Sequence, residues 1–230
     1  MVLANIAVTQ SRDRQGICMN EHATPAATPS ALRVHGTGLV VCAIFAALWA
    51  NWARPLLTDS PAAWAWGAAV TVAVTSGALL IAGVSMIRRG RRLSRVTGIG
   101  DTAPHHMRSG FKQVLIAEIV VLNVAAYFLI GHHAAQYLAP AVAVVVGLHF
   151  LPLAKIFRSP HFVATAAAMT LAGILAAVAM ATGSSATAAN GVADLACAIA
   201  LWGTGFVSWS RVHKAIAHSH AIIAATDPAH

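Results

Sequence analysis

The sequence predicts an all-α, polytopic integral membrane protein, a bundle of six transmembrane helices with both termini in the cytoplasm. Of its 230 residues, 58% are hydrophobic and 10% are Asp, Glu, Lys or Arg, whereas a soluble domain carries about 25% charged residues. The mean hydropathy is +0.70. Because so few charges cannot cover a soluble fold of this size, most of the surface is expected to face lipid.

Six stretches are apolar over the roughly 20 residues that a helix needs to cross a bilayer. The expected spans lie at about 34–53, 62–87, 111–130, 137–157, 161–181 and 190–212. They divide the chain into a flexible tail at 1–32, a transmembrane domain at 33–213 and a second tail at 214–230. The basic segment at 87–96 either extends the second span or lies along the membrane surface.

Several spans carry helix-end signals. Ser60-Pro61 and Ser159-Pro160 each place a hydroxyl residue before a proline, which favours an N-cap followed by the first helical position. Gly131 and Gly183 follow apolar runs and are expected as helix C-caps.

The basic residues alternate between the two sides of the predicted membrane. Arg54 is alone on one side, and fourteen basic residues fall on the other, namely Arg12, Arg14, Arg33, Arg88, Arg89, Arg91, Arg92, Arg95, Arg108, Lys112, Lys155, Arg158, Arg211 and Lys214. Lys and Arg accumulate in cytoplasmic connections. The pattern therefore supports six spans, places both termini in the cytoplasm and indicates an inner (plasma) membrane protein.

Small and aromatic residues suggest how the helices pack. Ala65, Ala69, Ala73 and Gly77 form one row at four-residue spacing, and a second row comprises Ala164, Ala168, Ala172 and Ala176. Such rows allow close helix approach, within one chain or in a homo-oligomer. Trp49, Trp52, Trp64 and Trp66 gather at the ends of the first two spans, where tryptophans typically anchor at the membrane interface.

Ionisable residues inside the spans are the strongest functional candidates, because burying them in a membrane is costly. Glu118 lies six residues inside Lys112, and His149 lies six residues before Lys155, which places both about 9 Å along their helices. The two spans are antiparallel and joined by a short loop, so we expect Glu118 and His149 to meet. Such a pair can exchange a proton or bind a cation, and Asn123 is placed to add a hydrogen bond.

Two further features accompany this candidate site. Gly147 and Pro152 flank His149, and the proline is expected to break or kink the helix. Asp194 is expected in the first turn of the sixth span, where a carboxylate complements the helix dipole.

No pattern predicts a metal or cofactor site. The twelve histidines include no pair at the spacing that places two ligands on one helix face, although haem ligation by His35 and His149 stays open. The expected partners are the bilayer and its anionic headgroups, which would face a basic, lipid-facing loop comprising Arg88, Arg89, Arg91, Arg92 and Arg95. Nucleic acid is not expected, because no aromatic residues interleave with these arginines.

The sequence leaves three functions open. Hydrolase and phosphate-binding motifs are absent, so an enzyme is not predicted. The first hypothesis is a small transporter or permease-like protein, linked to protons through Glu118 and His149. The alternatives are a non-catalytic membrane regulator, assembly factor or partner subunit, and a haem or metal redox protein.

Overall fold

The computed structural model describes residues 28–57, 61–97, 105–156 and 159–226. These form six long α-helices, α2 (Pro29–Trp52), α3 (Ala62–Thr97), α4 (His105–Gly131), α5 (Leu138–Ile156), α6 (His161–Ala181) and α7 (Ala186–Thr226). Short 3-10 helices η2 (Arg54–Leu57) and η3 (Ala135–Tyr137) follow α2 and precede α5. All six long helices are long and apolar enough to cross a membrane, which confirms the all-helical prediction and the number of candidate spans.

Four helices are longer than their predicted spans, among them α4, which begins at His105. Helix α3 runs to Thr97, so the basic segment at 87–96 extends the second helix, and α7 runs to Thr226. The segment from residue 214, predicted as the second tail, is therefore helical as far as Thr226. Helix α2 begins at Pro29, inside the predicted first tail, most of which lies outside the described residues.

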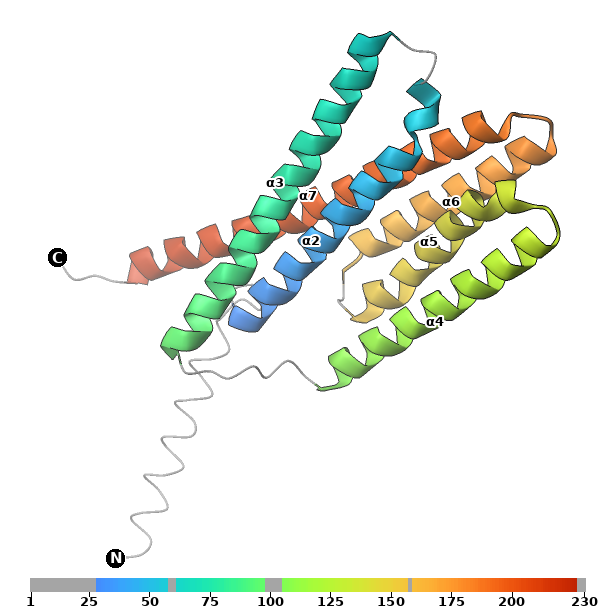
Figure 1. Cartoon of the computed structure of the whole chain (residues 1–230). Coiled ribbons are helices and arrows are strands. Elements are labelled where there is room, and N and C mark those ends of the chain that lie inside the picture. The colour runs from blue at the N-terminus through green and yellow to red at the C-terminus, as the bar shows by residue number, and fades with distance from the viewer. Residues whose placement is uncertain (1–27, 58–60, 98–104, 157–158, 227–230) are drawn as a thin grey trace, which may run out of the picture.

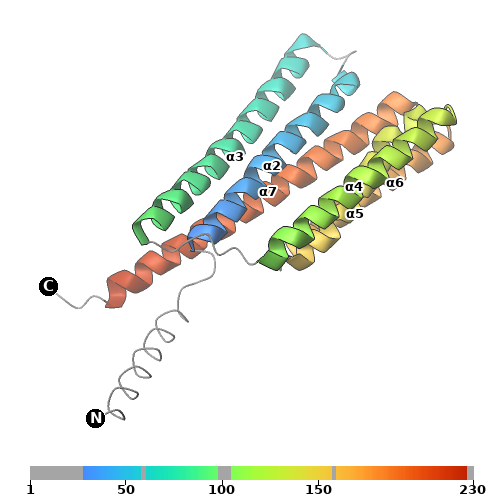
Figure 2. The same ribbon diagram turned by 60° about the horizontal axis from the view of Figure 1, so that its bottom comes forward.

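The main helix contacts follow the order α3, α2, α7, α6, α5, α4. Helices α3 and α4 are consecutive in the chain but lie at opposite ends of this order (Figures 1 and 2). Helix α7 lies in the middle and also contacts α3 and α5. The described basic residues gather where α2 begins, α3 and α5 end and α7 continues. We call this the arginine-rich end, and Arg54 of η2 lies at the opposite end.

Helices α2 and α3 approach closely at a glycine pair. A Cβ atom placed on Gly83 would lie 2.7 Å from the carbonyl oxygen of Gly36, and one placed on Gly36 would lie 2.6 Å from the oxygen of Gly83. Leu79 and Met86, one turn to either side of Gly83, are buried. Small residues thus allow the two backbones to approach, as is typical of helix pairs in membranes.

The predicted small-residue rows pack against other helices of the chain only in part. On α3, Ala65, Ala69 and Ala73 are exposed, and a Cβ atom on Gly77 would meet nothing within 4 Å. On α6 the second row is divided, because Ala164 and Ala168 are exposed while Ala172 and Ala176 pack near α7. The close approach depends instead on glycines that these rows do not include.

The largest core cluster joins α2, α5, α6 and α7. Its buried members include Trp49, Phe150, Met169 and Leu201. Trp49 is 2% exposed, so its predicted role as an interface anchor is wrong. Trp52, Trp64 and Trp66 are exposed, as that role requires.

The helix ends follow the predicted signals only in part. Gly183, with φ +102°, follows α6, and its N–H and that of Ser184 donate to Met180 and Ala179, which completes a Schellman motif. After α4 the left-handed residue is His133, with φ 56°, and not Gly131. The Ser159 hydroxyl bonds the His161 ring and does not cap α6, and Ser60 lies outside the described residues.

The surface of the described chain is rich in apolar side chains. Ile81 is 73% exposed and Tyr127 is 77% exposed. Between Gln113 and Gly131 no residue of α4 is fully buried. Since large exposed apolar patches mark contact with membrane or partner, this surface agrees with the composition.

Candidate functional site

Glu118 of α4 and His149 of α5 meet as the sequence predicts. His149 Nδ1 lies 3.0 Å from Glu118 Oε2, and the side chains are 10% and 15% exposed, respectively. The approach lacks the alignment of a hydrogen bond, because His149 Nδ1 has no hydrogen-bond partner. The contact is therefore an electrostatic one, whose strength depends on the protonation of both groups.

Three residues predicted to accompany this pair, Gly147, Pro152 and Asn123, differ in the structure from their predicted roles. Helix α5 is continuous through Gly147 and Pro152, so the predicted break at these residues is not seen. Gly147 instead allows close packing on α6, since a Cβ atom there would lie 2.5 Å from Thr170 Oγ1. Asn123 is not part of the pair, because its amide donates to the Ile119 carbonyl at 2.7 Å and its side chain is exposed.

Asp194 lies on the sixth long helix, as predicted, but not in its first turn. Helix α7 begins at Ala186, so Asp194 is more than two turns inside it, and the helix-dipole explanation is wrong. Its side chain is 3% exposed, and Oδ1 has no hydrogen-bond partner. The structure thus places Asp194 apart from Glu118 and His149, as a second buried carboxyl group.

A polar network between α6 and α7 was missed from the sequence. His161 Nε2 and Nδ1 lie 2.9 Å from the hydroxyls of Ser208 and Ser159, respectively, and Arg211 Nη1 lies 3.3 Å from Nδ1. Because a guanidinium can only donate, Nδ1 is an acceptor and Nε2 carries the proton toward Ser208.

The same network continues toward the core through two threonines. The hydroxyls of Thr165 and Thr204 bond each other, and both side chains are buried. Residues 204, 208 and 211 repeat at intervals of four and three, which places them on one face of α7. That spacing of hydroxyl and basic residues is the signal in the sequence that could have predicted the network.

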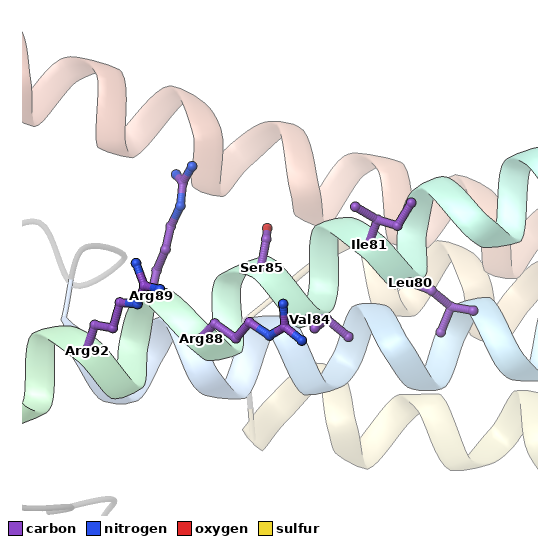
Figure 3. A pocket seen from close by; sticks show the side chains of 7 residues that line it. All are labelled: Leu80, Ile81, Val84, Ser85, Arg88, Arg89 and Arg92. Atoms are coloured by element: carbon purple, nitrogen blue, oxygen red, sulfur yellow. The ribbon is translucent and has the colours of Figure 1, made fainter.

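The arginine-rich end of α3 carries a surface groove (Figure 3). It has a volume of about 430 Å³ and combines three arginines with one hydroxyl and three apolar side chains, namely Arg88, Arg89, Arg92, Ser85, Leu80, Ile81 and Val84. Arg91 and Arg95 are exposed on the same helix but do not line the groove. The groove therefore divides the predicted basic loop into two groups of arginines.

Two other cavities lie near the helices. One, of about 640 Å³, extends from Leu151 to Val163 at the turn between α5 and α6, and one of about 410 Å³ is lined mainly by alanines of α6 and α7. None of the three cavities is lined by Glu118 or His149.

The positions of the possible ligands bear on the alternatives of a metal or haem site. Among the described residues, no three His, Cys, Asp or Glu side chains come together as metal ligands. His35 Nδ1 lies 2.8 Å from the Ala31 carbonyl oxygen of its own helix, and its side chain is exposed. One ring nitrogen of His35 is therefore already bonded within its own helix.

Comparison with known proteins gives no relative from which a function can be inferred. No family model matches the chain, and neither a curated protein nor a solved structure is similar to it.

Proposed function

We propose that this chain is a six-span inner (plasma) membrane protein with both termini in the cytoplasm, and that it acts as a small proton-linked transporter. Six long apolar helices and the exposed apolar surface support membrane insertion. The fourteen-to-one distribution of basic residues supports the orientation. The contact between Glu118 and His149 is the observation on which the proton linkage rests.

The pair lies where its charge affects helix docking. Helix α4 packs mainly on α5, and Glu118 faces that interface as the one polar side chain among its described half-buried positions. With Glu118 ionised and His149 protonated, the two charges compensate each other. With a single charge left, the interface holds an uncompensated ion, which is strongly unfavourable away from water. Gain or loss of one proton would thus change how firmly α4 is held.

Proton flux in liposomes tests the proposal. The purified chain is reconstituted with a pH-sensitive dye inside, and flux is driven by an imposed potential in the presence of a mixture of small metabolites. We expect Glu118→Gln to abolish flux, while Tyr127→Phe, an exposed position on the same helix, leaves it unchanged. Full flux from a folded Glu118→Gln protein would contradict the proposal, and Glu118→Asp covers the case in which the first variant fails to fold.

Cysteine labelling tests the orientation separately. In a background without Cys18, Cys42 and Cys197, a membrane-impermeant maleimide added outside cells should label His132→Cys and leave Lys214→Cys unlabelled until the membrane is opened. The reverse pattern would overturn the assigned topology.

One observation favours a second function, that of a partner subunit or regulator. None of the three cavities reaches Glu118 and His149, and the face of α4 away from α5 is apolar and exposed. In that case the chain would purify with a stable partner and show no flux. The exposed row Ala65, Ala69 and Ala73 is the surface on which a homo-oligomer would form by close helix approach.

We also propose that the groove on α3 binds an anionic lipid. Its three arginines suit a phosphate headgroup, and Leu80, Ile81 and Val84 offer an apolar track for an acyl chain. Figure 3 shows Arg89 and Arg92 toward one end of the groove and Leu80 and Ile81 toward the other, with Arg88 extending toward Val84 between them.

A further inference from the structure

Two oxygen atoms near the start of α7 lack hydrogen-bond donors. They are Oδ1 of Asp194 and Oδ1 of Asn190, and both atoms are buried without a partner. The two residues are four positions apart, which places them on the same helix face about 5–6 Å from each other. Asp194 is also among the most buried polar residues of the described chain, at 3% exposure.

The orientation of the Asn190 amide is fixed from outside α7. Its Nδ2 donates to the carbonyl oxygen of Gln136 in η3 at 3.1 Å. Rotating the amide would set two oxygens against each other and lose that bond. Oδ1 of Asn190 is therefore a hydrogen-bond acceptor, as are both oxygens of an ionised Asp194. This face of α7 thus holds two buried acceptor atoms, Oδ1 of Asn190 and Oδ1 of Asp194, that receive no hydrogen bond.

Protonation of Asp194 would supply the donor that these two oxygens lack. An ionised carboxylate is strongly unfavourable when a buried oxygen of it receives no hydrogen bond, as is the case for Oδ1 of Asp194. Transfer of a proton from hydronium to the Asp194 carboxylate removes the charge, releases a water molecule and creates an O–H donor. Oδ1 of Asn190 is the buried acceptor one turn away.

The charges around Asp194 do not provide the missing compensation. Cys197, one turn further along α7, is a buried thiol, Arg54 of η2 is exposed, and Tyr137 of η3, next to Gln136, is half-buried. Most other described titratable or charged side chains on the packed helices lie in the half of their helix toward the arginine-rich end, with Cys42 near the middle of α2. They are Arg33, His35 and Cys42 of α2, Arg88, Arg89, Arg91, Arg92 and Arg95 of α3, His149 and Lys155 of α5, and His161 of α6.

We propose that Asp194 and Asn190 form a proton-binding site in α7, at the end opposite to the arginines, in which the protonated carboxyl of Asp194 donates to Oδ1 of Asn190. The ligand is the proton. The site is separate from the contact between Glu118 and His149, since it lies on another helix, and it does not depend on the proposed transport.

Thermal unfolding of the full chain in detergent, as a function of pH, tests the site. The melting temperature of the wild-type protein should fall as pH rises and Asp194 loses its proton, because the unfolded state does not bind that proton as tightly. Asp194→Asn keeps a donor and carries no charge, so it should fold and lose this part of the pH dependence. Glu118→Gln should keep it, which separates this test from that of the proposed function.

Modification by dicyclohexylcarbodiimide, which reacts with protonated carboxyls in apolar surroundings, identifies the residue. Peptide mass spectrometry should locate the adduct on Asp194, with labelling that falls about tenfold per pH unit above its midpoint. Asn190→Ala should move that midpoint to lower pH. Identical pH dependence of melting in wild type and Asp194→Asn would overturn the proposal, and so would suppression of labelling by Na⁺ at constant pH, which would indicate a metal cation in place of the proton.

Discussion

Replacing Gly83 with alanine should destabilise the fold at the crossing of α2 and α3. The added Cβ atom would lie 2.7 Å from the carbonyl oxygen of Gly36 and 3.1 Å from Cβ of Leu39. The Gly36 oxygen belongs to a helical backbone and cannot rotate away. Even the close C–H···O contacts of proteins keep carbon and oxygen about 3.3–3.6 Å apart, so the two helices must separate by about 0.6 Å at this point.

Overpacking of this kind costs about 1–3 kcal/mol. For a chain of this length each kcal/mol corresponds to a fall of about 2–4 °C in the melting temperature. Gly77→Ala is the matched control, because a Cβ atom on Gly77 of the same helix would meet nothing within 4 Å. We expect that variant to melt with the wild type.

The double variant Gly36→Ala/Gly83→Ala sharpens the test. Each added methyl group is directed at the carbonyl of the other glycine, so one separation of the helices relieves both clashes. The combined loss of stability should therefore be smaller than the sum of the two single losses. Unfolding in mixed micelles, followed by tryptophan fluorescence, measures all three variants. If Gly83→Ala were as stable as Gly77→Ala, or if the two losses simply added, the close glycine crossing would be refuted.

Two further predictions concern the groove on α3 and the contact between Glu118 and His149. Arg88→Gln and Arg92→Gln should each weaken the binding of anionic lipid by about 1 kcal/mol, measured by native mass spectrometry. Arg95→Gln, which lies outside the groove, should have a smaller effect. Equal losses from all three variants would indicate that lipid responds to the general surface charge and not to the groove. A double-mutant cycle of Glu118→Gln and His149→Gln should give a coupling energy of about 0.6 kcal/mol and at most about 1.7 kcal/mol, which is the range for polar contacts between membrane helices. Strictly additive losses of stability would mean that the 3.0 Å contact between the two side chains does not stabilise the fold.

The sequence predicted the number of helices and the contact of Glu118 with His149 for a simple physical reason. Helices joined by a short loop must pack side by side, and residues at equal distances from the basic ends then meet. This reasoning needs only hydropathy and the rise per residue. It gives the depth of a residue but not the direction in which its side chain points, which is why Asn123 was placed near the pair although it bonds its own helix.

The packing faces could not be predicted from apolar periodicity. In lipid the outer surface of a helix is as apolar as its inner surface, so hydrophobic spacing does not mark the interior. The alanine row on α3 illustrates the problem, because alanines are frequent on every face of this chain. Trp49 was assigned to the interface for a similar reason, although it is buried among α2, α5, α6 and α7.

The error on Asp194 came from where the last helix begins. Hydropathy placed the start near Asn190, because the segment from Ala186 to Ala189 consists of three alanines and one threonine and has no large apolar residue. The cap is Ser185, whose hydroxyl accepts from the Ala188 N–H. A serine followed by good helix formers is an N-cap signal, and reading it would have placed Asp194 deep inside the helix.

The polar residues of the interior indicate which helix contacts can respond to protons. The α6–α7 interface is joined by the hydroxyls of Thr165 and Thr204 and by the bond between His161 and Ser208, with Arg211 beside the His161 ring. In contrast, among the described side chains of α4, from residue 113 on, Glu118 is the one polar group at the interface with α5. Docking of α4 therefore depends on one titratable side chain, whereas the α6–α7 interface keeps the hydroxyl contact between Thr165 and Thr204 whatever the protonation of His161. Since α4 also lies at the end of the helix order, it is the helix that can shift with the least loss of other contacts, which is the physical basis for assigning proton coupling to this interface.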